Sequence, residues 1–411
     1  MRIDFKTTSP VPPGKNIAKI RWAAWLLIAA LSVFFTEVVS GGTPSVFVNI
    51  YGLLVITPLY FLQMMVLLPL LFRLGRPSVR TLYFAGAVFG LFEAYITKVI
   101  WQPVDYPVDL FAGGVAVATT LMLVFFWHPL MSMVIPLFTA DGLLNAHKTL
   151  KIELPFQRLQ RVKPVVLLAG LGALMGLIQG AALGNPVEAL FSAVSSTLII
   201  WVLIRVWRYL AGKTVFTLSQ LLPSQAQWRI FAFLLAAYYL VLTFTLRADA
   251  FPVWPGHVIV AGLYLLMGGL WLRSRKQDQE ILFQPAPETP PVLLNLNTGR
   301  WLIFSGGFIA LSAAGGLLPV WGQDGVHFAL WGAGILCGLA AFGWFVWQMA
   351  SRLKLNWKLP DFRRLFYTLK ARLRPVTAPG LQFRVPKPRL DIKALLRKAL
   401  AFTRSGSIHR P

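Results

Sequence analysis

Long apolar runs separated by short polar segments dominate this sequence. A run of about 18 or more apolar residues is long enough for a helix that crosses a bilayer. Ten such candidate helices lie at about 20–40, 47–72, 81–101, 111–138, 165–183, 187–209, 228–246, 258–272, 301–318 and 326–350. Inside a membrane the backbone must satisfy its own hydrogen bonds, which favours helices. We therefore predict an all-α fold, a polytopic transmembrane helical bundle of about ten helices.

Composition agrees with this pattern. The 411 residues are 56% hydrophobic and only 13% charged, whereas about a quarter of the residues of a soluble protein are charged. The first apolar run follows Arg21 and carries Glu37 near its end. At about twenty residues it exceeds the apolar core of a signal peptide, which is about 7–15 residues long. We expect it to be the first membrane helix.

The net charge of +24 is unevenly placed. Lys and Arg concentrate in alternate loops and in the C-terminal segment, and Arg247 is the basic residue found in the opposite set of loops. Basic loops stay on the cytoplasmic side of a membrane. The pattern predicts a multi-pass protein of the cytoplasmic (inner) membrane with both termini in the cytoplasm, and it favours a membrane surface over any specific nucleic acid as the partner of these charges.

The chain is expected to have five parts. These are a cytoplasmic lead (1–19), helices one to four with a polar cluster (20–139), a basic cytoplasmic loop (140–164), helices five to ten (165–350) and a basic amphipathic tail (351–411). The tail has sixteen Lys or Arg residues and two Asp residues. Basic amphipathic helices lie on anionic membrane surfaces. We expect the tail to bind anionic lipid headgroups; docking to RNA, a ribosome or an acidic partner is the alternative, and a membrane-protein partner for the chain also stays open.

The sequence gives no sign of a cofactor. It contains no phosphate-binding glycine loop, no dinucleotide fingerprint and no HExxH motif, and Cys337 is its single cysteine. One cysteine forms neither an intrachain disulfide nor a cysteine-based metal site. We predict no cofactor and no metal site.

The third apolar run, 81–101, contains Glu93 and Lys98. Charged residues inside a membrane face a protein interior or a watery cavity. At about 1.5 Å of rise per residue, Glu93 lies about 18 Å along its helix, and His128 lies about 15 Å from the same side in helix four. These similar depths would allow Glu93 to meet His128 near the middle of the bilayer, and a hydrogen bond between them is one arrangement that the sequence permits. Similar depths near the outer interface suggest an ion pair between Glu37 and Lys98.

The predicted polar cluster consists of Glu37, Gln63, Glu93, Thr97, Lys98 and His128. Glu93 and His128 are the candidate catalytic residues, as a general base and its orienting partner. Structural alternatives stay open: Glu37 and Lys98 can anchor helix ends at the headgroups, and His128 can be a packed histidine at the kink made by Pro129.

Two short motifs carry a resemblance. The segment 93–98, EAYITK, resembles the EExxxR motif of CAAX-protease-like (CPBP) intramembrane proteases, and 124–128, VFFWH, resembles their FxxxH motif. The resemblance implies that Glu93 and His128 activate water within the membrane. Ala94, Lys98 and Val124 stand where that family has Glu, Arg and Phe.

A second resemblance concerns Glu37 and the turn 40–44, SGGTP, that follows it. This arrangement is similar to uncharacterised prokaryotic polytopic membrane proteins, and it implies no activity. Three functions therefore stay open: transport or lipid handling through a polar cavity near Glu93, a CPBP-like hydrolase or its inactive relative, and a structural or assembly subunit of a membrane complex. The glycines at every fourth position of 172–184 predict close helix packing, either static or sliding.

Overall fold

A computed structural model describes residues 16–72, 77–103, 109–145, 164–212, 214, 216–281 and 297–351. The chain divides into two units, Met1–Leu353 and Lys354–Pro411. The predicted tail lies outside the described residues, as do most of the lead and the central part of the basic loop. The fold below is that of the first unit.

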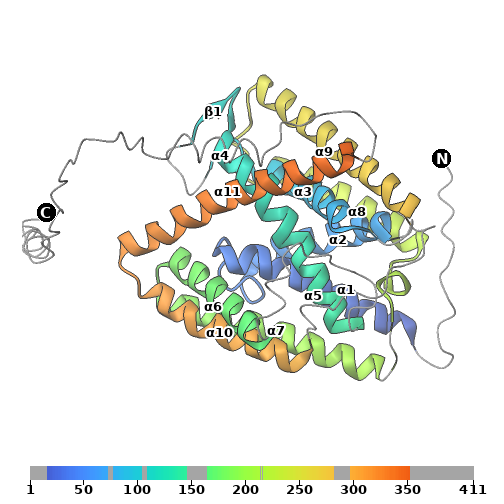
Figure 1. The fold of residues 1–411 in the computed structure, drawn as a ribbon, viewed down its shortest axis with the longest axis vertical. Helices are drawn as coiled ribbons and strands as arrows, with labels where there is room; N and C mark the ends of the chain where they lie inside the picture. Colours follow the sequence, from blue (N-terminus) through green and yellow to red (C-terminus); the bar gives the residue numbers. More distant parts are fainter. Residues whose placement is uncertain are drawn as a thin grey trace, which may run out of the picture. The chain divides into compact units, whose positions relative to one another are not determined.

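The described residues are almost entirely helical (Figure 1). The helices are α1 (Ile17–Val33), α2 (Thr57–Phe72), α3 (Val79–Thr97), α4 (Val117–Thr120), α5 (Ile135–Asn145), α6 (Pro164–Leu183), α7 (Pro186–Ala211), α8 (Gln225–Thr245), α9 (Trp254–Ile281), α10 (Thr298–Gly316) and α11 (Val320–Ser351). Within this part of the chain, nine helical stretches are long and apolar enough to cross a membrane. The predicted all-α polytopic bundle is confirmed.

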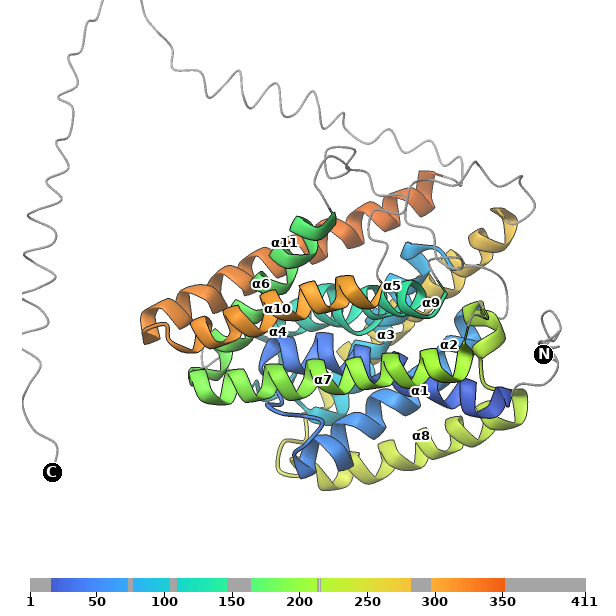
Figure 2. The ribbon, with the colours of Figure 1, turned by 90° about the horizontal axis from the view of Figure 1, so that it is seen from below.

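The helix α10 is the one predicted crossing that is missing from those nine. It forms a helix as expected, but its sequence contains five glycines together with Thr298 and Arg300. Small and polar residues lower its hydropathy, and they suit a helix that packs closely on another. In both views of the ribbon α10 lies beside α6 (Figures 1 and 2).

Three segments are wound as π-helix: η1 (Phe34–Val38), η2 (Gly52–Ile56) and η3 (Leu121–Val134). π-helical turns are rare in proteins, and those that occur often lie at functional sites. Glu37 lies in η1 and His128 lies in η3. The second predicted helix was expected from residue 47, but residues 41–48 form bends and turns, with left-handed backbone at Gly41 and Ser45.

The fourth predicted helix begins later than expected. Residues 111–116 form a hairpin in which β1 (Phe111–Ala112) pairs with β2 (Val115–Ala116). Its turn is made by Gly113 and Gly114, which both have positive φ, as tight hairpin turns require. Asp109 accepts hydrogen bonds from the backbone N–H groups of Ala118 and Thr119, and so caps the helix that follows.

Two helices extend beyond their predicted ends. The helix α5 continues to Asn145, into the segment expected to be loop from residue 140. The helix α9 continues to Ile281 instead of ending at 272, because Asp278 is buried against α3. Arg80, expected to be a loop-edge charge, is 4% exposed and pairs with Asp278 at 3.4 Å.

Glycines set the contact between α6 and α10. A Cβ atom on Gly172, Gly176 or Gly180 would collide with a backbone carbonyl oxygen of α10. On α10, Gly315 meets the backbone of α6 in the same way. The small-residue face predicted from the sequence is therefore a direct backbone-to-backbone contact.

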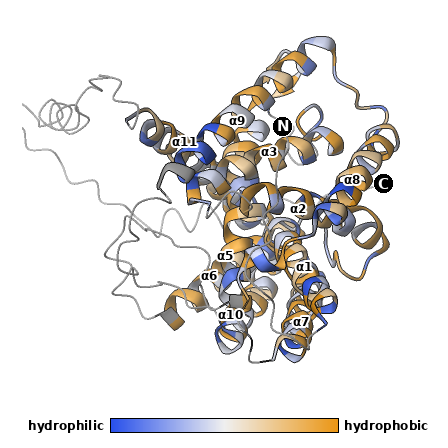
Figure 3. Ribbon diagram, turned by 90° about the vertical axis from the view of Figure 1, so that its right-hand side faces the viewer, coloured by the Kyte–Doolittle hydropathy of each residue, from blue (hydrophilic) through white to orange (hydrophobic). Residues whose placement is uncertain are grey.

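The helix α3 is the most deeply buried of the candidate spans: 83% of its apolar window is buried, against 11% for α8 and α11. It contacts η3, α9, α8 and α2. Hydrophobic residues lie on the outward faces of the helices as well as between them (Figure 3). Such outward apolar faces suit a surrounding lipid bilayer, and charged side chains of α3 are enclosed by protein.

Candidate functional site

Glu93 of α3 and His128 of η3 are in direct contact. Glu93 Oε2 lies 2.9 Å from His128 Nε2. Both residues are buried, with 7% and 2% of their surfaces exposed. The structure thus brings together the two residues that the sequence places at similar depths, and it encloses an acid–base pair inside the bundle.

Two glycines allow this contact. A Cβ atom on Gly90 would lie 2.7 Å from His128 Cβ, and one on Gly86 would lie 2.6 Å from Pro129 Cα. Both distances are shorter than packed atoms tolerate, so only glycine lets α3 approach η3 this closely. Glu93 is three residues after Gly90 and therefore lies on the same side of α3.

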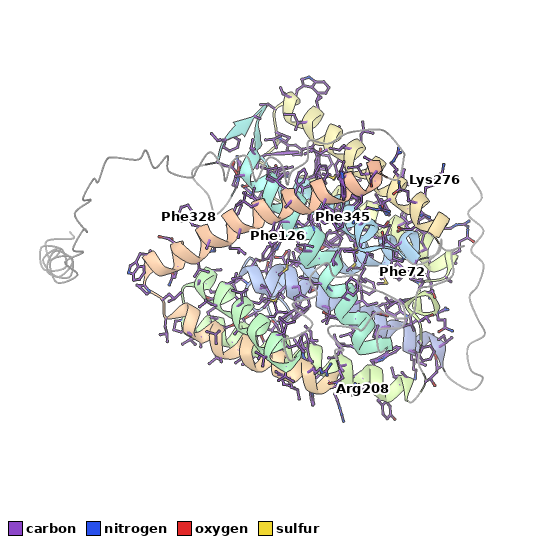
Figure 4. All side chains as sticks on the ribbon, viewed as in Figure 1. Phe72, Phe126, Arg208, Lys276, Phe328 and Phe345 are labelled. Carbon is purple, nitrogen blue, oxygen red and sulfur yellow. The ribbon has the colours of Figure 1, made fainter. Side chains whose placement is uncertain are left out.

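The helix α11 also packs closely on η3. A Cβ atom on Gly338 of α11 would lie 3.0 Å from Phe126 Cβ. Phe345 lies further along α11, with its ring centroid 5.1 Å from that of Tyr83 (Figure 4). Phe328, near the other end of α11, is 71% exposed. The part of α11 that packs on η3 and α3 thus helps to hold the pair in place.

The second ring nitrogen of His128 has its own partner. His128 Nδ1 lies 2.8 Å from the hydroxyl of Ser132, one turn further along η3. Ser132 Oγ in turn lies 2.9 Å from Thr36 Oγ1. Ser32 and Trp127 also bond across this contact, to the carbonyls of Ser132 and Thr36. Both nitrogens of the imidazole are therefore fixed, which holds the ring in one orientation.

Glu37 follows Thr36 in η1 and has two hydroxyl donors. Tyr60 donates to Oε1 at 2.6 Å, and Thr43 donates to Oε2 at 2.9 Å. Glu37 is also near enough to Glu93 and His128 for their charges to interact. Two carboxyl groups and one imidazole therefore share one region of the bundle.

The predicted ion pair between Glu37 and Lys98 is wrong. The helix α3 ends at Thr97, and Lys98 has left-handed backbone with φ of 59°. This turn directs its ammonium group to the C-terminal end of α8, where it donates to the carbonyls of Thr243, Leu246 and Arg247. Carbonyls at a helix C-terminus carry partial negative charge and attract cations.

Lys98 is also enclosed: its residue is 2% exposed, and Nζ lies 4.5 Å from the centre of the Phe251 ring. Burial lowers the pKa of Lys98 below its ordinary value, and nearby Asp249 opposes this shift. The headgroup-anchor alternative for Lys98 therefore does not describe its contacts, which are all with protein groups in the described part of the chain.

The two remaining predicted members lie at the edge of the cluster. Gln63 is 2% exposed and donates from Nε2 to the hydroxyl of Tyr239. Thr97 bonds back to the carbonyl of Glu93 at 3.0 Å. In the described part of the chain neither bonds to the carboxylate of Glu93 or to His128, so they border the pair without completing it.

The sequence prediction missed the hydroxyl groups that connect the charged residues: Thr36, Thr43, Tyr60 and Ser132. Three of them had a usable signal. Ser132 is four residues after His128, a spacing that places side chains on neighbouring turns, Thr36 is adjacent to Glu37, and Thr43 lies in the turn that follows Glu37. Tyr60 is distant in sequence, and only the fold brings it to Glu37.

The arrangement is suited to binding or moving a proton. Its members alternate between carboxyl, imidazole and hydroxyl groups, all of which both give and accept hydrogen bonds. Among the residues that the structure describes, no three His, Cys, Asp or Glu side chains gather in a way that could hold a metal ion. Buried ionisable groups in membrane proteins mark ion and substrate paths and proton relays.

Comparisons with known proteins agree with the membrane assignment. Residues 26–354 match the model of a family described as an uncharacterized membrane protein family. An uncharacterized protein of Archaeoglobus fulgidus is 35% identical over 246 residues, which cover 59% of this chain and 75% of that protein. No solved structure matches. The predicted resemblance to uncharacterised prokaryotic membrane proteins is confirmed, whereas neither match names the CPBP proteases.

Proposed function

Because the chain belongs to this uncharacterized membrane protein family, we propose its function from the site: transport of a polar or charged group, carried by a solute or a lipid head, along a path through α1, α2, α3 and η3. The observation that carries the proposal is the buried contact between Glu93 and His128 at 2.9 Å. A buried ion pair adds little to stability compared with well-packed apolar residues. An acid and a base kept inside a membrane bundle therefore favour a functional role.

The surroundings of the pair support this role. Two helical segments beside the pair depart from regular α-helix: η1, which contains Glu37, and η3, which contains His128. π-helical turns free or redirect backbone and side-chain groups, and they occur often where ligands bind. Pro129, next to His128, removes one backbone donor from η3. The proposed path thus follows the part of the bundle whose helices are least regular.

Accessibility of Thr97 to water tests the proposal. Thr97 lies one turn beyond Glu93 and is 9% exposed. A Thr97→Cys variant in a Cys337→Ala background has a single thiol, because Cys337 is the chain's one cysteine. In sealed proteoliposomes we expect this thiol to react with the membrane-impermeant cation MTSET, since a transport path opens to water and a thiolate forms only where water reaches it.

Two single-cysteine controls bracket the result. Ala248→Cys, in the exposed turn after α8, should react rapidly. Leu265→Cys, in the candidate span formed by α9 and 79% exposed on its outward face, should stay unreactive in lipid. If Thr97→Cys is as unreactive as Leu265→Cys, the pair is sealed in a static core and the transport proposal fails.

One observation favours hydrolysis as a second candidate. With Ser132 holding one nitrogen of His128 and Glu93 contacting the other, the imidazole is oriented as a general base or its partner would be. Water bound beside Glu93 would then attack an amide or ester within the membrane. Cleavage of a quenched fluorescent peptide in detergent by the wild type, and its loss in Glu93→Gln, would support this candidate; no cleavage by the wild type would oppose it.

A further inference from the structure

We propose that a chain of hydroxyl groups carries a proton between His128 and Glu37, so that a proton is the ion coupled to transport. The inference rests on the proposed function and names its coupling ion. Its basis is two hydrogen-bonded series of buried side chains that end at neighbouring residues of η1: Glu93, His128, Ser132 and Thr36 form the first, and Tyr60 and Glu37 form the second.

The first half of this series lies between α3, η3 and η1. Glu93 Oε2 is 2.9 Å from His128 Nε2, His128 Nδ1 is 2.8 Å from Ser132 Oγ, and Ser132 Oγ is 2.9 Å from Thr36 Oγ1. Each distance is within hydrogen-bond range. Both hydroxyl-bearing residues are buried, with 0% exposure for Ser132 and 2% for Thr36.

The second half joins η1 to α2. The Tyr60 hydroxyl donates to Glu37 Oε1 at 2.6 Å, and Glu37 directly follows Thr36 in η1. Tyr60 is fully buried, and its ring lies against Phe89 of α3 at 5.2 Å between centroids. In the proposed path the Thr36 hydroxyl turns toward that of Tyr60, which joins the hydroxyls beside His128 to the carboxylate of Glu37.

The transfer step conserves atoms and charge. Protonated His128 gives the hydrogen on Nδ1 to Ser132, which passes its own hydrogen to Thr36. Thr36 passes its hydrogen to Tyr60, and the phenolic hydrogen of Tyr60 moves to the carboxylate of Glu37. The step begins with a charged imidazolium and a carboxylate and ends with a neutral imidazole and a carboxylic acid. Rotation of the three hydroxyl groups restores the starting arrangement.

The structure also contains an interruption of this path. Thr36 Oγ1 can donate instead to the carbonyl of Ser32, at 2.8 Å. A threonine hydroxyl has one hydrogen, so when Thr36 donates to Ser32 it cannot donate to Tyr60. Rotation of this one side chain therefore connects or disconnects the two carboxyl groups. Proton movement therefore needs this rotation, and its rate depends on how often Thr36 turns toward Tyr60.

Proton movement into vesicles tests the inference. Proteoliposomes are loaded with the pH-sensitive dye pyranine, and a potassium gradient with valinomycin sets an inside-negative potential. The wild type should acidify the lumen faster than protein-free vesicles do. Tyr60→Phe and Ser132→Ala each remove one hydroxyl and keep the shape of the side chain, and each should slow acidification by roughly tenfold or more.

Tyr238→Phe is the matched control, because Tyr238 lies outside the proposed proton path and donates to the backbone carbonyls of Leu54 and Val55. It should acidify at the wild-type rate. Wild-type vesicles that acidify no faster than protein-free ones overturn the inference, and so do Tyr60→Phe and Ser132→Ala variants with wild-type rates. If Thr97→Cys still reacts with MTSET in those cases, the transport proposal survives and only the proton path fails.

Discussion

Two regions of the bundle bring helices together in different ways. In the polar region, made of α1, α2, α3 and η3, charged and hydroxyl-bearing side chains bond between helices, as Glu93 does with His128. In the glycine region, made of α6 and α10, the backbones touch directly at Gly172, Gly176 and Gly180. Direct backbone contact of the second kind is enough to hold two helices together, since small residues give close packing without burying charge.

The difference indicates where function lies. The glycine region is joined by direct backbone contact and by a buried hydrogen bond from Ser312 to Gln179. The polar region keeps two carboxyl groups and an imidazole in the membrane, although each is costly there. We infer that the glycine region is scaffold and that the polar region carries the activity. The following variants test this contrast.

The largest effect is expected from His128→Ala. It leaves Glu93 buried without its basic partner, which should reduce the free energy of unfolding by about 3 to 5 kcal/mol. Denaturant unfolding in mixed micelles measures the loss. His327→Ala is the control, because His327 is only partly buried, in α11. Equal stability of the two variants would show that the pair does not bear on the fold of the polar region.

Next in size is Gly176→Ala in the glycine region. The new Cβ would press against the carbonyl of Phe308, and overpacking of this kind costs about 1 to 3 kcal/mol. Gly170→Ala has no neighbour within 4 Å and should change nothing. The midpoint of thermal unfolding in detergent separates them. A Gly176→Ala protein as stable as the Gly170→Ala protein would mean that the α6–α10 contact slides and is not a fixed scaffold.

A smaller loss is expected from Lys98→Met. It removes the bonds from Nζ to the carbonyls that end α8, worth about 2 kcal/mol for a charged donor. Lys98→Asn should be less harmful, because asparagine adopts left-handed backbone readily. Lys276→Met, at an exposed position of α9, controls for the lost charge. If the Lys98→Met protein is as stable as the Lys276→Met protein, the bonds from Lys98 to α8 do not stabilise the fold, and the headgroup-anchor role is favoured instead.

The smallest loss of stability should come from Gly90→Ala, about 1 kcal/mol, the low end of the cost of overpacking, because the new Cβ meets the side chain of His128. This Cβ would displace His128 from α3, which lengthens the contact with Glu93. We expect slower acidification of pyranine-loaded vesicles together with this loss of stability. Gly262→Ala, with open space around it in α9, should behave as the wild type. Normal acidification by Gly90→Ala would show that close approach of the two helices is unnecessary for proton movement.

Helix positions and the depth of Glu93 and His128 could be predicted because both follow from the linear pattern of residues and the rise of a helix. Depth from the rise per residue gave the wrong partner for Lys98. This estimate assumed that the helix continues through residue 101, whereas the left-handed turn at Lys98 directs its side chain to α8. Arg80 and Asp278 were similarly assigned to loops, because their burial depends on contact between α3 and α9, which are far apart in sequence.

The hydroxyl groups escaped prediction for a related reason. An uncharged Ser or Thr inside a helix usually bonds to its own backbone, as Thr97 does. The linear pattern places Ser132 one turn after His128 and Thr36 beside Glu37, but it does not show that the two hydroxyls bond to each other. Only the close packing at Gly90 and the position of η1 beside η3 turn them into links between charged groups.

The double variant Glu93→Met/His128→Leu tests most directly whether the pair is a site or a packing device. Apolar side chains of similar size can replace a buried ion pair without loss of stability, so the variant should fold and insert normally. We predict that its vesicles acidify no faster than protein-free vesicles. A double variant that folds normally and still acidifies at the wild-type rate would contradict the central claim that Glu93 and His128 carry the activity.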